Sequence, residues 1–136
     1  MFFKKNNNQN DDLSKVAALL IYAAKIDENY SPAEEEIIKR ALLRIGASSE
    51  NVGKIIADGK KIEEDSNQIL DFTKEVKNME QENKIKIIET LWRIIYSNND
   101  ADMYETNLMR RLTGLLYVDN KLMGDIKDKI KKEISK

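Results

Sequence analysis

Apolar residues recur along the chain at intervals of three and four positions, which is the spacing of one face of an α-helix. After Asp11 and Asp12 this face consists of Leu13, Val16, Ala17, Leu20, Ala23 and Ala24. Six later segments repeat the pattern. None shows the sustained alternation of apolar and polar residues that a half-buried strand requires. The pattern therefore predicts an all-α fold of seven helices without a sheet.

Capping signals indicate where these helices begin and end. Ser31, Pro32 and Glu34 combine an N-cap, a first-turn proline and the glutamate of a capping box, and Gly46 suits the end of the same helix. The other helices are expected to begin at Asp11 or Asp12, after Ser48 or Ser49, at Ser66, at Gln81, after Asp102 and after Asp119. Residues 1–10 are expected to be a flexible N-terminal tail, and residues 11–136 a single helical domain.

The periodic stripes also predict the core. The residues expected to be buried are Leu20, Ile38, Leu42, Leu91, Trp92, Ile95, Leu112 and Ile126. In the last helix the stripe is expected to run from Leu122 to Ile134. A chain of 136 residues with so few helix breakers can bury an ordinary core of this kind.

A weak internal repeat relates the two halves of the chain. A shift of 71 residues without a gap places Leu20 on Leu91, Glu34 on Glu105 and Arg40 on Arg111. Each half also has the same order of elements: an apolar helix, an acidic turn, a capped helix, a short turn and a helix. The repeat predicts two pseudo-equivalent three-helix halves with the fourth helix as connector.

Composition excludes several classes of chemistry. There is no cysteine and no histidine, so thiol nucleophiles, imidazole bases and ordinary zinc sites are ruled out. Lys plus Arg is 23 and Asp plus Glu is 24, which leaves no broad basic field for nucleic acid. The longest apolar run, residues 16–24, is too short to span a bilayer, and no signal peptide follows Met1. A cytoplasmic protein without membrane insertion is expected.

Two acidic turns are the only constellation with candidate chemistry. The first contains Asp27 and Glu34, and the second contains Asp100, Asp102 and Glu105. Oxygen-bearing side chains at alternate positions are typical of the start of a calcium loop, but the glycine and the final glutamate of an EF-hand are missing. Two interpretations stay open. The carboxylates serve only as helix caps, or they also bind Ca²⁺ or Mg²⁺ weakly.

The same turns resemble those of the tellurite-resistance TerB-like family. Residues 23–27 followed by Glu34 look like a first copy of the family motif, and residues 91–96 followed by Glu105 and Arg110-Arg111-Leu112 look like a second. The resemblance implies an all-helical fold and a bacterial cytoplasmic protein. Relatives include tellurite-resistance proteins and the N-terminal part of a membrane-anchored DnaJ-like co-chaperone, and metal chelation by acidic residues has been proposed for the family.

The sequence departs from the family pattern in both turns. Glu28 stands where the family has glycine after the first aspartate, and Asn98-Asn99 replaces the second Asp-Gly. Asn98 lacks the full charge of Asp27, which makes Asp27 the better candidate ligand. These residues show neither a J-domain nor a membrane anchor, so the co-chaperone role is not expected to carry over.

Two functions follow from these observations. The first is a non-enzymatic interaction or stress-response module with a protein partner and with a divalent cation as a candidate ligand. The second is an enzyme, or an accessory subunit of one, that uses carboxylates and a divalent metal. The sequence provides no nucleophile motif or phosphate-binding loop for the second, and it does not determine the oligomeric state.

Overall fold

The computed structural model describes residues 2–25, 31–66, 70–97 and 103–134, and these residues form seven helices. The helices are α1 (Phe2–Ala24), α2 (Pro32–Ile45), α3 (Val52–Asp65), α4 (Leu70–Lys77), α5 (Gln81–Tyr96), α6 (Met103–Leu115) and α7 (Asn120–Ile134). No strand occurs in this part of the chain. The predicted all-α class and the number of helices are confirmed.

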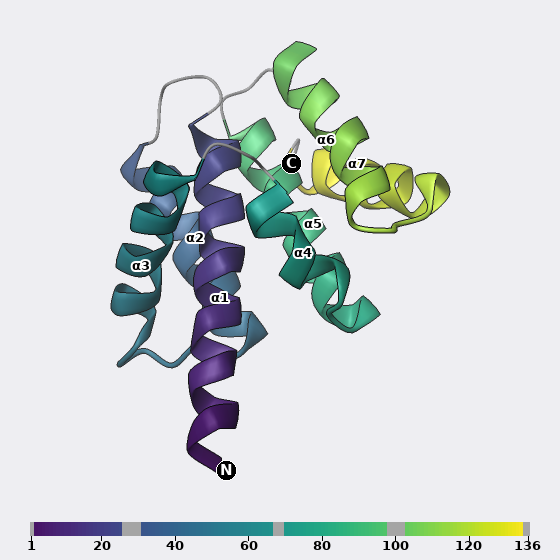
Figure 1. Cartoon of the computed structure of the whole chain (residues 1–136). Helices are drawn as coiled ribbons and strands as arrows, with labels where there is room; N and C mark the ends of the chain where they lie inside the picture. The colour runs from purple at the N-terminus through teal and green to yellow at the C-terminus, as the bar shows by residue number, and fades with distance from the viewer. Residues whose placement is uncertain (1, 26–30, 67–69, 98–102, 135–136) are drawn as a thin grey trace.

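Helix α1 is the centre of the bundle (Figure 1). It packs most extensively against α3 and also contacts α2, α4 and α5. Its residues from Val16 to Ile21 are all fully buried, because neighbouring helices surround this part of α1. Ion pairs join its rim to two neighbours: Lys15 pairs with Glu75 on α4 at 3.0 Å, and Lys25 with Glu63 on α3 at 2.7 Å.

The start of the first helix differs from its prediction. Helix α1 begins at Phe2 rather than at Asp11 or Asp12, and its first turns extend beyond the rest of the bundle (Figure 1). A capping residue marks a possible helix start, but it does not stop a helix that is already formed upstream. The flexibility of residues 1–10 stays a prediction, because helical geometry does not report motion.

The predicted core is confirmed at all eight positions, whose side chains are at most 4% exposed. The prediction of burial is wrong for Ile134, which is 44% exposed. Helix α7 packs chiefly against α5, and its last buried apolar residue is Ile130. Ile134 lies one turn further on, at the end of the helix, where periodicity alone does not reveal that the neighbouring surface has ended.

The two halves match in part. The shift of 71 residues places α2 on α6, and the closely packed pair α1–α3 corresponds to the pair α5–α7. The middle helices differ, because α2 contacts α1, α3 and α5 whereas α6 lies mainly against the connector α4. Duplication therefore accounts for the order of the helices but not for the position of α6.

Candidate functional site

Glu34 lies in the first turn of α2, where a complete capping box positions it. The backbone N–H of Ser31 donates to Glu34 Oε1 at 2.9 Å, and the backbone N–H of Glu34 donates to Ser31 Oγ at 3.2 Å. Pro32 provides the preset first residue of the helix. The predicted cap is confirmed, and it places a carboxylate at the positive end of the helix dipole.

The second oxygen of Glu34 is unusual. The residue is only 1% exposed, and Oε2 is buried without a hydrogen-bond partner among the described residues. A buried carboxylate oxygen is costly unless a donor or a cation compensates it. Capping uses Oε1 alone, so it does not explain why Oε2 is also withdrawn from water.

Three of the other four predicted site residues lie outside the part of the chain that the structure describes. Asp27 lies in 26–30, and Asp100 and Asp102 lie in 98–102, all outside the described residues. Glu105 is the third residue of α6, just as Glu34 is the third residue of α2, but its side chain is not described. Among the described residues, no group of three or more acidic residues could hold a metal ion. A site shared by Asp27 and Glu34 stays a prediction.

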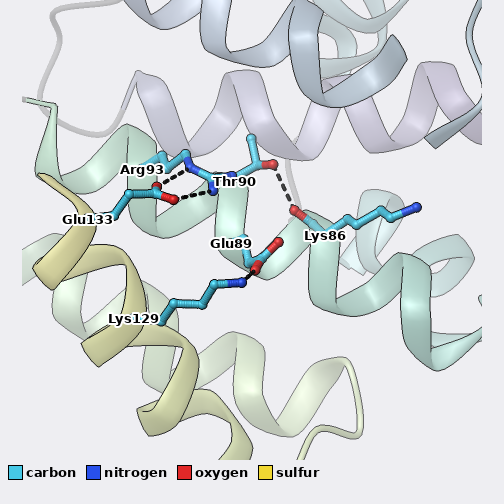
Figure 2. A network of polar contacts seen from close by, with 6 residues as sticks. All are labelled: Lys86, Glu89, Thr90, Arg93, Lys129 and Glu133. Atoms are coloured by element: carbon cyan, nitrogen blue, oxygen red, sulfur yellow. Dashed lines mark hydrogen bonds and ion pairs between the residues drawn. The ribbon is translucent and has the colours of Figure 1, made fainter. Parts of the chain in front are cut away.

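A second polar cluster joins α5 to α7 (Figure 2). Lys129 Nζ donates to Glu89 Oε2 at 2.6 Å, and the guanidinium of Arg93 donates to both carboxylate oxygens of Glu133 at 3.0 and 3.3 Å. Both pairs span 40 residues, so the two helices run in the same direction. The hydrogen bonds from Arg93 hold the pKa of the Glu133 carboxyl below its usual value of 4.5.

Aromatic residues extend this interface. Trp92 stacks on Tyr96 at 5.8 Å between ring centroids, and Lys127 Nζ lies 5.4 Å from the centre of the Trp92 ring. Burial, with a further contribution from the charge of Asp128, raises the pKa of Tyr96. Cations and anions pair with each other here, so the cluster acts as a clamp that holds α7 on α5.

The sequence-based prediction did not include this clamp. Glu89 and Arg93 are four residues apart on one helix, and Lys129 and Glu133 are four apart on another. Equal spacing of opposite charges was therefore an available signal. It could not identify the partner helix, because two charged residues at such spacing are common on any solvated helix face.

The fold and site define the class of the protein: a small all-helical module with a buried acidic residue at the first turn of a capped helix. A family model, described as tellurite resistance protein TerB, matches residues 13–128. The chain belongs to the TerB family, which confirms the resemblance seen in the acidic turns. Comparisons with curated proteins and with solved structures found no match. No helix in the described part of the chain is long and apolar enough to cross a membrane.

Proposed function

We propose that the chain is a non-enzymatic interaction module of the tellurite-resistance, stress-response type, acting in the bacterial cytoplasm. We further propose that its first acidic turn binds a divalent cation weakly. The observation that supports the cation site is the buried, unpartnered Oε2 of Glu34. A hard cation such as Ca²⁺ or Mg²⁺ would compensate this oxygen, since both ions prefer carboxylate ligands.

The proposed ligands come from the two ends of the first acidic turn. Glu34 contributes Oε2 from a helix that its own capping box holds in place, and Asp27 contributes a second carboxylate from seven residues upstream. Asp100, Asp102 and Glu105 are the corresponding candidates in the second turn. With so few charged ligands per turn, the dissociation constant should be about 10⁻⁴–10⁻³ M. A bound cation would tie the turn to the start of α2.

The non-enzymatic role is supported by the pairing of four glutamates in the described part of the chain. Glu63, Glu75, Glu89 and Glu133 each form an ion pair that links two helices. A carboxylate that acts as a base needs access to a substrate proton. These carboxylates stabilise the packing of the bundle instead.

The test is a titration with Ca²⁺ and Mg²⁺, followed by NMR and by thermal melts. In the wild-type protein we expect amide shifts at residues 27–35 and a higher melting temperature in millimolar Ca²⁺. Asp27→Asn and Glu34→Gln should each abolish both effects, because each removes one charged ligand. Glu34→Gln keeps an oxygen that can accept the Ser31 N–H, so the cap is retained.

Ser31→Ala is the matched control, since it removes the capping hydroxyl and leaves both proposed ligands. Its response to Ca²⁺ should equal that of the wild type. A rise in melting temperature that survives Asp27→Asn would exclude Asp27 as a ligand. The absence of a rise in the wild type would refute the cation site and leave Glu34 as a cap alone.

A further inference from the structure

The end of α6 contains a backbone conformation that is unfavourable for its residue. Tyr117 has φ of 55°, and among the described residues no other residue except glycine has a positive φ. This left-handed conformation is strained for a side chain with a Cβ atom. Burial of the side chain does little to offset this strain, because Tyr117 is 74% exposed.

The first half of the chain shows that the turn does not need tyrosine. The shift of 71 residues places Gly46 on Tyr117, and Gly46 also has a positive φ, of 139°. One backbone hydrogen bond corresponds as well: the N–H of Ala47 donates to the Leu42 carbonyl at 2.9 Å, and the N–H of Val118 donates to the Thr113 carbonyl at 3.1 Å. The first half therefore places glycine, which has no Cβ atom, at the position that corresponds to Tyr117. Strain that packing does not require is a reason to look for a functional site.

Tyr117 forms one wall of a groove between α4 and the end of α6. The described residues that line the groove are Thr73, Lys74, Lys77, Gly114, Leu115 and Tyr117. Lys77 Nζ lies 5.0 Å from the centre of the Tyr117 ring, so a cation and an aromatic face stand together at the rim. A Cβ atom on Gly114 would meet no atom within 4 Å, which leaves the floor open.

The charged residues that line the groove are all basic. None of its six lining residues is acidic, and neither Lys74 nor Lys77 forms an ion pair with a side chain that the structure describes. The exposed Arg111 precedes Gly114 and Leu115 by three and four positions and so shares their helix face. Two lysines therefore line the groove, and a third cation lies on the adjoining face of α6, in a protein whose net charge is −1.

We propose that this groove binds an acidic segment of a partner protein. Carboxylates of that segment would pair with Lys74, Lys77 and Arg111, and an apolar side chain would occupy the space over Gly114 and Leu115, against the Tyr117 ring. Exposed tyrosine and arginine are typical of binding surfaces. A phosphate polymer fits less well, because it favours a broad basic face and only two of the residues that line this groove are basic. The inference rests on the proposed role as an interaction module and is independent of the cation site.

The probe is a labelled twelve-residue peptide of four Glu-Glu-Leu repeats, with a Gln-Gln-Leu counterpart as control. Titration of the full chain, followed by NMR, should shift amides of residues 73–77 and 111–118 with the acidic peptide only. The double variant Lys74→Glu/Lys77→Glu should weaken binding about tenfold, and binding should weaken as salt is raised. The matched variant Lys54→Glu/Lys61→Glu carries the same change in charge on exposed positions of α3 and should bind as the wild type does.

Tyr117→Gly tests peptide binding separately from the stability of the fold. This variant should melt at a higher temperature than the wild type and yet lose the peptide shifts. Unchanged peptide affinity in both Tyr117→Gly and Lys74→Glu/Lys77→Glu would overturn the proposal, and so would the absence of saturable shifts in the wild type. Poly-uridylate that produces the same shifts at lower concentration would also overturn it. None of these results bears on the response to Ca²⁺, so failure of the groove and failure of the cation site are distinguishable.

Discussion

Gly59 is a position where the packing of α1 against α3 leaves no room for one added atom. A Cβ atom placed on Gly59 would lie 2.7 Å from Ala17 Cβ, 3.1 Å from the backbone N of Ala18 and 3.1 Å from the backbone O of Ser14. Two of these three atoms belong to the backbone of α1, so no change of side-chain rotamer can relieve the contacts. Gly59→Ala must therefore separate the two helices.

The magnitude follows from two opposing effects. Overpacking in a well-filled core costs about 1–3 kcal/mol, and contacts with backbone atoms favour the upper part of this range. Alanine gains about 0.5–1 kcal/mol over glycine inside a helix. We therefore expect Gly59→Ala to lower the free energy of unfolding by about 1–2 kcal/mol. With a denaturant slope of about 2 kcal/mol per M, the urea midpoint should fall by about 0.5–1 M.

Two further variants make the measurement specific. Gly124→Ala, in the interior of α7, places its Cβ in open space and should raise the stability by about 0.5–1 kcal/mol. Ala17→Gly, combined with Gly59→Ala, removes the 2.7 Å contact and should recover part of the loss. Urea unfolding followed by circular dichroism measures all three. A midpoint for Gly59→Ala equal to or above that of the wild type would refute the proposed separation of α1 and α3.

Three other predictions test the core, the cap and the clamp. Leu42→Ala and Leu112→Ala, at fully buried positions, should each cost about 2–5 kcal/mol, and unchanged denaturation midpoints would contradict the core assignment. Ser31→Ala should cost about 0.5–2 kcal/mol in thermal or urea unfolding, because the Glu34 amide loses its acceptor. The lowered pKa of Glu133 means that its contribution to stability is present above its usual value of 4.5 and is lost as the pH falls through the lower folded-state pKa. The drop in melting temperature below pH 4.5 should be smaller in Arg93→Gln, and an identical pH profile would argue against this ion pair.

Local features of the fold followed from the sequence because they depend on neighbours within one helical turn. The Ser31 cap, the end of α2 at Gly46 and the Asp119 side chain that accepts the N–H of Lys121 all lie within three residues of the helix ends that they stabilise. The buried stripes follow from the helical period. These interactions need no information about which helices pack together.

The candidate site was predicted less completely. The capping box identified Glu34 as a first-turn carboxylate, but the burial of its second oxygen depends on the surrounding helices. Tyr117 gave no signal, because tyrosine at the end of a helix does not predict a left-handed backbone. Its positive φ in the folded chain reveals the strain.

The sequence by itself determined that this protein has seven helices, where α2 ends and which faces are apolar. Tertiary structure alone decided that α7 pairs with α5 across 40 residues, that α6 lies on α4, and that Gly59 allows α1 and α3 to approach closely. The physical reason is the range of the interactions. Capping and periodicity act over three or four residues, whereas packing joins surfaces far apart in the chain, and many pairings of apolar faces satisfy the same local pattern.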